Sequence, residues 1–289
     1  MSNLKQITSE IDELFRFKDL TGAYEEIASM KMRRIRGTVL FNRDFIYALA
    51  EIYREVSVSN RNELLRLIKE KKKTNDFALR PHNGKTAVIF LSANSGLFGA
   101  ILKNAYQEFI KYIDSHPGEP IIVGEFGKKM FEAQFPSRKF TFFPLQGDSI
   151  NPETLKIVTN SLMQFENVII FYAHFNSMAS QGVAMLDVAG EETPMLQKEI
   201  LSANYAFEPS MGKILEFFEQ EIFANIMEQN FTESELARHA ARIIALDTAT
   251  KNIDVRLKKI DLEHRVAIHR ILNKKQTEAL GGMMLWNIK

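Results

Sequence analysis

The sequence has no cysteine among its 289 residues. This absence excludes a disulfide framework, thiolate metal ligands and a cysteine nucleophile, and it fits a reducing compartment. An excess of charge is missing too, because 37 basic side chains nearly balance 36 acidic ones. A net charge of +1 gives no global argument for binding nucleic acid or an acidic substrate. With 45% hydrophobic residues, the chain still has enough apolar side chains to bury a core.

Signals for secretion and membrane insertion are also missing. The N-terminal run MSNLKQITSEIDELF lacks the basic start and apolar run of a secretory signal. No stretch approaches the roughly 20 apolar residues of a membrane-spanning helix. We therefore expect no direct membrane insertion, and any membrane association to go through partners.

Proline is absent from both flanks, since all eight prolines lie between Pro81 and Pro209. Because proline ends or kinks helices, its absence permits long helices at both ends of the chain. Both flanks also have mostly apolar residues at alternating steps of four and three, which we call the seam positions. The N-terminal seam positions are Ile7, Ile11, Leu14, Lys18, Thr21, Glu25, Ala28, Met32, Ile35, Val39, Asn42, Ile46, Leu49, Tyr53 and Val56, and the C-terminal ones are His239, Ile243, Leu246, Thr250, Ile253, Leu257, Ile260, His264, Ala267 and Ile271. A sustained seven-residue repeat predicts a left-handed coiled coil. Helices of 60 to 80 residues would span about 90–120 Å.

The proline-containing middle has a different pattern. Apolar or β-branched runs predict strands at 85–92, 120–126, 139–145, 167–175 and 182–188, with helices near 99–114 and 151–165. This alternation predicts a small, mostly parallel sheet, with the last two strands as an antiparallel edge. The expected fold is α/β, with a central Rossmann-like domain and a long antiparallel coiled coil of the N- and C-terminal helices. The predicted segments are 1–75, 76–206 and 207–289.

No motif predicts a catalytic, cofactor or metal site. The run NGKT at 83–86 lacks the first glycine of a phosphate loop and precedes a strand, so we expect a plain turn. The run SANSGLFGA at 92–100 lacks a third glycine, and we expect Gly96 and Gly99 to serve the turn and the helix packing. No two histidines have the spacing of a zinc-protease helix. His239 and His264 fall on the seam, where we expect polar packing residues.

Two segments suggest contacts with partners. The basic residues Lys31, Arg33, Arg34 and Arg36 form either a solvated face or a surface that attracts acidic loops of a partner encircling the helix. The C-terminal run GGMMLWNIK contains Met283 and the only tryptophan, Trp286. Burial in a partner would explain these apolar side chains at a chain end.

Several segments together resemble the gamma subunit of F-type ATP synthases, the central rotor shaft. They are TGAYEEIASMKMRRIR (21–36), SGLFGA (95–100), YAFEPS (205–210), AARIIALDTATKN (240–252) and EALGG (278–282). The third of these is similar to the Tyr-x-Glu-Pro run before the last helix of the family. The fourth is similar to the family run Ala-Ala-Arg-Met-x-Ala-Met-x-x-Ala-Thr-x-Asn.

The resemblance implies a non-catalytic rotor subunit that binds no nucleotide or other cofactor. Its coiled coil would turn inside a ring of alternating alpha and beta subunits. Its central domain would sit on the membrane-embedded rotor ring, with epsilon as a further partner. The location it implies is peripheral, on the cytoplasmic side of the inner (plasma) membrane.

The sequence departs from the family at positions expected to touch partners. The family usually has Ser-Glu before the Ala-Ala-Arg, where this chain has Ala237 and Arg238. A family Arg-Gln pair is replaced by Ile268 and His269, a Glu becomes Lys275, and an Asn after the glycine turn becomes Leu102. The predicted partner-interface residues are Lys31, Arg33, Arg34, Arg36, Arg238, Arg242, Asn252, Ile268, His269, Lys275, Met283 and Trp286.

These departures favour a divergent gamma subunit of a specialised or alternative rotary ATPase. A gamma-like stalk of a motor not used for ATP synthesis stays open as a function. A nucleotide-binding α/β protein that dimerises through its coiled coil is the third alternative.

Overall fold

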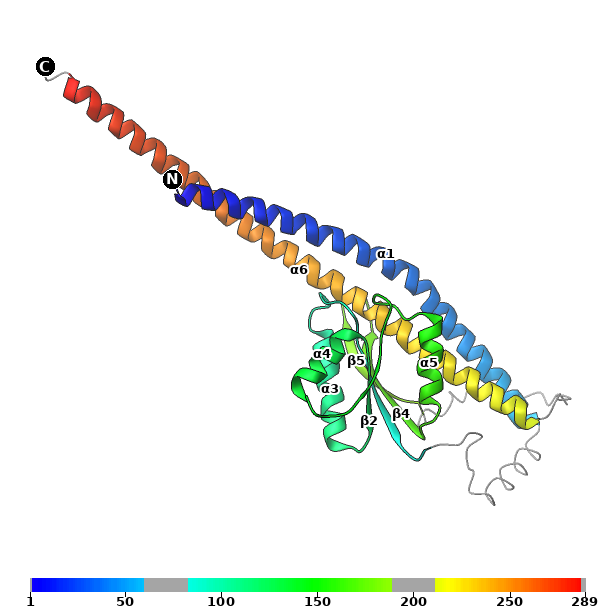
Figure 1. Cartoon of the computed structure of the whole chain (residues 1–289). Coiled ribbons are helices and arrows are strands. Elements are labelled where there is room, and N and C mark those ends of the chain that lie inside the picture. Colours follow the sequence, from blue (N-terminus) through cyan, green and yellow to red (C-terminus); the bar gives the residue numbers. More distant parts are fainter. Residues whose placement is uncertain (1, 60–82, 189–210, 287–289) are drawn as a thin grey trace. The chain divides into compact units, whose positions relative to one another are not determined.

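The computed structural model describes residues 2–59, 83–188 and 211–286. Each end of the chain forms one long helix, α1 (Ser2–Ser59) and α6 (Met211–Trp286) (Figure 1). Contacts divide the chain into two compact units, one of residues 1–29 with 242–289 and the other of residues 30–241. The predicted segment boundaries at 75/76 and 206/207 lie outside the described residues and stay predictions.

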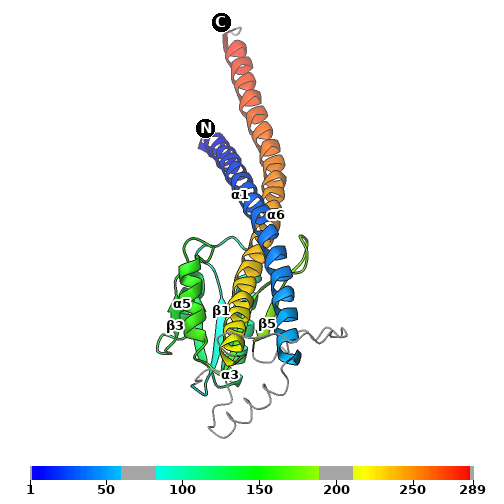
Figure 2. The same ribbon diagram turned by 90° about the vertical axis from the view of Figure 1, so that its right-hand side faces the viewer.

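In the first unit, the start of α1 and the later part of α6 run side by side as an antiparallel pair (Figures 1 and 2). Lys18 Nζ lies 2.6 Å from Asp254 Oδ1. The hydroxyl oxygens of Thr21 and Thr250 are 3.0 Å apart. A later residue of α1 thus pairs with an earlier residue of α6. Arg256 donates to the carboxylate of Glu10. The helices are therefore antiparallel, as the sequence predicts.

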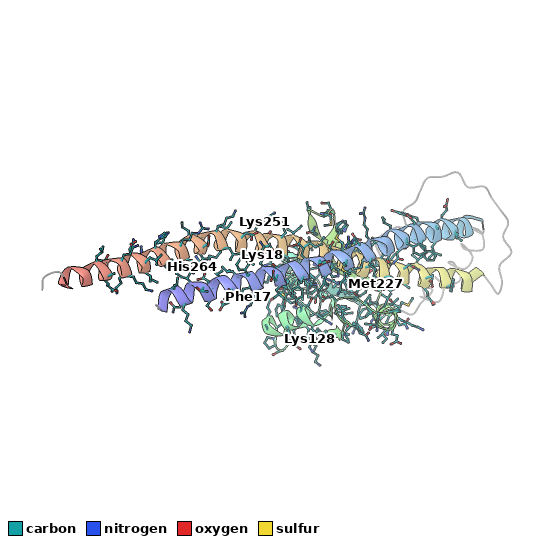
Figure 3. The ribbon with its side chains drawn as sticks, turned by 90° about the horizontal axis from the view of Figure 1, so that it is seen from above. Phe17, Lys18, Lys128, Met227, Lys251 and His264 are labelled. Atoms are coloured by element: carbon teal, nitrogen blue, oxygen red, sulfur yellow. The ribbon has the colours of Figure 1, made fainter. Side chains whose placement is uncertain are left out.

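Burial follows the predicted seam closely. Every seam position from Ile7 to Leu49 is buried or half-buried. Of the other described side chains in that range, all are exposed except the half-buried Glu10 and Ser29. The positions from Ile243 to Ile271 are likewise buried or half-buried, and Ile260 is fully buried. In Figure 3 the seam residue Lys18 and its exposed neighbour Phe17 are both labelled on α1.

In the second unit, five strands form one sheet in the order β3-β2-β1-β4-β5. The strands are β1 (Thr86–Leu91), β2 (Glu119–Val123), β3 (Thr141–Phe143), β4 (Asn167–Phe175) and β5 (Gln181–Asp187). The pairs β1–β2, β1–β4 and β2–β3 are parallel, and β4–β5 is antiparallel. The predicted strands, their parallel pairing and the antiparallel edge are confirmed.

Helices cover both faces of this sheet, and β1 therefore reads as a continuous apolar run. On one face Val88 and Phe90 pack with α3 (Ile101–Ser115) and α4 (Glu125–Gln134). On the other face Ile89 packs with α5 (Pro152–Leu162) and with Met227 of α6. The C-terminal helix therefore helps to form the core of the α/β domain.

Helix α4 is the one described helix that the sequence pattern misses. It begins within the run 120–126, which predicts a strand, because Gly124 at φ 97° turns the chain sharply after β2. A Cβ at Gly127 would lie 2.7 Å from Ser92 Oγ, so this glycine allows α4 to approach β1. The expected role of Gly96 in close packing is wrong, since nothing lies within 4 Å of a Cβ there.

Candidate interaction surfaces and a buried polar junction

The basic cluster of Lys31, Arg33, Arg34 and Arg36 lies on α1, and all four side chains are exposed. Met32 is buried at the seam within the same run. Because only Met32 of this run is turned to the seam and buried, the four cations lie on the solvent side of α1 and form a positive surface.

Arg238 of α6 is buried within the second unit, with 4% of its surface exposed. Its Nη1 donates to Ser234 Oγ at 2.9 Å, one turn earlier on α6, and its Nη2 donates to the carbonyl oxygen of Asp148, also at 2.9 Å. Arg242 is also buried, at 6%. The chain itself covers both arginines, so they have little surface to offer a partner. The structure gives Arg238 an intramolecular role instead, joining α6 to the loop after β3.

Glu235 and His239 continue this buried junction. Glu235 accepts a hydrogen bond from Ser149 Oγ, and its carboxylate lies 3.6 Å from Nε2 of the fully buried His239. Burial alone would raise the pKa of Glu235, but the neighbouring His239, the hydrogen bond from Ser149 and the charge of Arg238 outweigh it. The pKa of Glu235 is therefore held below its ordinary value, and the carboxylate stays ionised.

The same loop joins the turn after β1. Asp148 Oδ1 accepts from the backbone N–H of Ser95 at 3.0 Å, and Oδ2 accepts from Ser95 Oγ at 2.6 Å. A bound phosphate at this turn would need such an N–H, and Asp148 already occupies it. The turn that opens α3 therefore serves as a structural link between the end of β1 and the loop after β3.

The run NGKT also forms a plain turn. The side chain of Asn83 accepts from the N–H of Lys85, and Lys85 Nζ lies 2.6 Å from Glu119 on β2. Gly84 has a φ of 68° in this turn.

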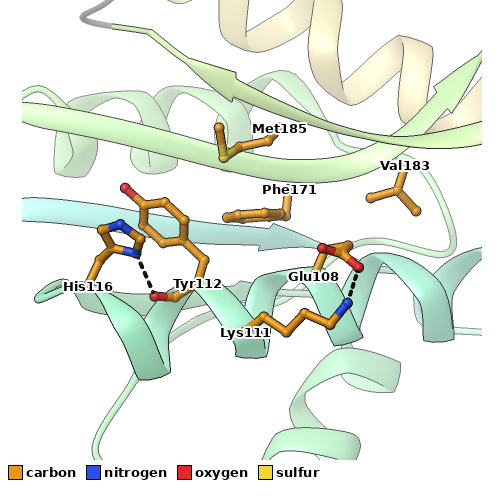
Figure 4. Close-up of a pocket in the computed structure, with 7 residues that line it drawn as sticks. All are labelled: Glu108, Lys111, Tyr112, His116, Phe171, Val183 and Met185. Carbon is orange, nitrogen blue, oxygen red and sulfur yellow. Dashed lines mark hydrogen bonds and ion pairs between the residues drawn. The ribbon is translucent and has the colours of Figure 1, made fainter.

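A shallow cavity of about 480 Å³ lies between α3 and the edge strand β5 (Figure 4). Tyr112 and His116 stack at 4.3 Å on one side, and Val183 and Met185 line it from β5. Its lining lysine, Lys111, pairs with Glu108 at 2.6 Å. Among the lining residues this leaves no free cation for a phosphate group.

The remaining predicted interface residues are on α6. Asn252, His269 and Lys275 are exposed, and Ile268 is half-buried. Met283 and Trp286 fall within the bounds of α6, but their side chains lie outside the described part of the chain. These assignments to a partner interface stay predictions.

The sequence reading misses the buried junction of Ser234, Glu235, Arg238 and His239. Its signal in the sequence is two adjacent polar pairs, Ser234–Glu235 and Arg238–His239, which start four residues apart and so share one side of the helix. A Ser–Glu pair also stands at Ser234 and Glu235, three residues before Ala237 and Arg238. This pair is almost one helical turn earlier than the pair the family usually has.

The fold and these surfaces define a class of protein: an α/β domain whose two chain ends form an antiparallel coiled coil. Within the described residues, no three histidine, aspartate or glutamate side chains group to hold a metal ion. None of the helices in the described ranges combines the length and apolar character needed to cross a membrane. A family model described as ATP synthase matches residues 3–267, and the chain belongs to this family. The curated relatives described next are ATP synthase gamma chains.

The ATP synthase gamma chain of Campylobacter curvus is 23% identical over 98% of this chain and 99% of the relative. That of Geotalea daltonii is 22% identical, with 98% of each covered. A central-stalk chain of the Tetrahymena thermophila mitochondrial ATP synthase has the same fold, with a TM-score of 0.55 and 16% identity over 80% of this chain and 99% of that chain. A chain of the Euglena gracilis mitochondrial ATP synthase matches with a TM-score of 0.51 and 16% identity, over 91% and 94%. The family predicted from the sequence is confirmed.

Proposed function

We propose that this chain is the non-catalytic central-stalk (gamma) rotor subunit of an F-type ATP synthase or ATPase. It would couple rotation in an alpha/beta catalytic head to ion translocation through a membrane ring. One observation carries the proposal. The predicted seam positions of α1 from Ile7 to Leu49 are buried or half-buried, in a chain that belongs to this family.

A shaft must transmit torque without slip between its helices and its body. In the first unit, the polar pairs Lys18–Asp254 and Thr21–Thr250 join α1 to α6 across the seam. In the second unit, Arg238 joins α6 to the loop at Asp148. Such specific polar contacts fix register more than they add stability.

Two separate surfaces would contact the head: the exposed basic cluster on α1 in the second unit, and Asn252, Ile268, His269 and Lys275 of α6 in the first unit. A cationic surface would steer and orient acidic loops of alpha or beta subunits. Epsilon and the rotor ring are the other partners, and the location is peripheral, on the cytoplasmic side of the inner (plasma) membrane. The departures at Ile268, His269 and Lys275 favour compensating changes in those partners.

Copurification tests the proposal. The tagged chain is expressed in the organism that encodes it and purified from detergent-solubilised membranes. Alpha- and beta-type subunits and ring subunits should copurify with it. Charge reversal of Lys31, Arg33, Arg34 and Arg36 to Glu should leave the chain folded and weaken ATP-driven rotation or coupling. A matched variant reverses Lys103, Lys129, Lys139 and Lys156, exposed cations of the α/β domain.

Two results would count against a rotor. One is a chain that purifies without alpha- and beta-type subunits. The other is micromolar binding of ATP or NAD to the isolated chain in isothermal titration, which would favour a nucleotide-binding protein.

A further inference from the structure

The turn after β1 lies at the edge of the sheet where folds of this type bind their ligands. In open sheets of mainly parallel strands, ligands bind outside the carboxyl ends of the strands, at the point where the strand order reverses. Here that point lies between β1, which connects through α3 to β2, and β4 on its other side. The turn at 92–100 therefore stands where a nucleotide-binding sheet of this kind would hold a phosphate group.

The chain itself fills the space beside this turn. Ala93 and Phe98 pack with Ala173 near the end of β4, and with Ala237 and Ala241 of α6. Small side chains on α6 allow this helix to approach the carboxyl edge of the sheet closely. Side chains of α6 thus occupy the region in which the rest of a ligand would lie.

An anionic group of the chain also occupies the phosphate position. The loop 144–151 leads from β3 to α5 on the opposite face from α3 and α4, so it crosses the carboxyl edge of the sheet. From this loop, Asp148 accepts the Ser95 N–H at Oδ1, at 3.0 Å, and the Ser95 hydroxyl at Oδ2, at 2.6 Å. Backbone N–H and hydroxyl donors are also the groups that hold a phosphate at such a turn.

The surroundings of Asp148 suit a buried anion. Asp148 is 9% exposed, and its carbonyl oxygen accepts from the buried Arg238 guanidinium at 2.9 Å. A cation held at the same residue offsets part of the cost of removing a carboxylate from water. Ser95 is exposed, so a small ion from solvent could reach its donors if the carboxylate were removed.

We propose that this edge of the sheet is an anion site that the chain occupies itself. The Asp148 carboxylate takes the place of a ligand's phosphate group and excludes phosphate-bearing ligands from the α/β domain. Removal of the carboxylate would convert the turn into a site for inorganic phosphate. The inference uses contacts within the second unit alone and does not depend on the rotor function.

Replacement of Asp148 by glycine in the full-length chain tests this site with inorganic phosphate as the probe. Hydrogen exchange is followed in peptides that cover residues 92–100 and 144–150, in phosphate and in chloride of equal ionic strength. Asp114→Gly is the control, because the exposed Asp114 also accepts a hydrogen bond, from Arg138 at 3.1 Å. This control corrects for the general stabilisation that phosphate gives to folded proteins. Asp148→Asn is the matched variant, because the amide keeps the size of the carboxylate and an acceptor oxygen but not the charge.

In chloride, both peptides should exchange faster in Asp148→Gly than in the unchanged chain, and phosphate should slow this exchange. A dissociation constant of about 5 mM would slow it about tenfold at about 50 mM phosphate, because the bound form gains by the factor 1 + [L]/Kd. The unchanged chain, Asp148→Asn and Asp114→Gly should each respond less than about twofold, since none of them gains a vacated anion position.

Three results would overturn the proposal. One is an Asp148→Gly chain that responds to phosphate no more than Asp114→Gly does. Another is an equal response in the unchanged chain, because the carboxylate would then not exclude phosphate. The third is slowing by formate but not by phosphate, which would show a position too small for a phosphate group. If Asp148→Gly folds in neither solution, Asp148→Ser takes its place with the same expected slowing, and absence of that slowing would overturn the proposal too.

Discussion

Replacement of Arg238 by methionine tests whether the buried junction holds α6 to the α/β domain. Methionine keeps a long side chain but removes the guanidinium, which donates at 2.9 Å to Ser234 and to the Asp148 carbonyl. Hydrogen bonds from a charged donor contribute about 1.5–3 kcal/mol each. Removal of one partner from a buried charged set costs about 3–5 kcal/mol. We expect a local loss of about 3 kcal/mol, because methionine regains some apolar burial.

Hydrogen exchange measures this loss where it occurs. Peptides that cover residues 144–150 and 230–241 should exchange roughly a hundredfold faster in the variant, since each 1.4 kcal/mol is a factor of ten. The control is Lys111→Ala, which breaks an ion pair of similar length between exposed side chains and should cost less than about 1 kcal/mol. If Arg238→Met changes exchange no more than this control does, Arg238 does not hold the junction.

Three further changes test other parts of the structure. Gly127→Ala should lower the denaturant midpoint, at a cost of about 1–3 kcal/mol, because its Cβ would meet Ser92 at 2.7 Å. The pKa of Glu235 is lowered in the folded chain, so its stabilisation is present above about pH 4.3 and is lost as pH falls through the folded value; Glu235→Gln should remove this part of the acid sensitivity of unfolding. Ile253→Pro should cost about 3 kcal/mol or more, reduce helicity in circular dichroism and impair assembly with the head.

The long helices could be predicted from the sequence because a heptad pattern depends on local spacing alone. Each seam position needs only the residues three and four away to define one face of a helix. The strands could be predicted for a similar reason, since both faces of the sheet are covered and runs such as 168–173 are apolar throughout. Burial at Ile7 and at Ile260 follows from the same pattern.

The intramolecular role of Arg238 could not be predicted in this way. Its acceptor at Asp148 is 90 residues away, and only the folded chain brings the loop after β3 to α6. A comparison of motifs treats Arg238 as a change of surface charge, because the sequence does not show which face of α6 is covered. Exposure on α1 could not be predicted either. The sequence shows Phe41 and Phe45 four residues apart, but it does not show that both side chains are exposed.

The polar residues within the seam have a consequence for axial position. A purely apolar heptad seam fits equally well after a slide of seven residues, about 10 Å along a helix. Such a slide would separate Thr21 from Thr250 in the first unit, and in the second it would separate the buried Asn42 from Glu228, whose carboxylate is 3.3 Å away. Asn42 would lose its partner while still shielded from water, which costs about 1–3 kcal/mol. The half-buried Thr21 and Thr250 would lose theirs at a smaller cost. The polar pairs therefore penalise every register but one, and that is the property a pair of helices needs if it is to turn as a single shaft.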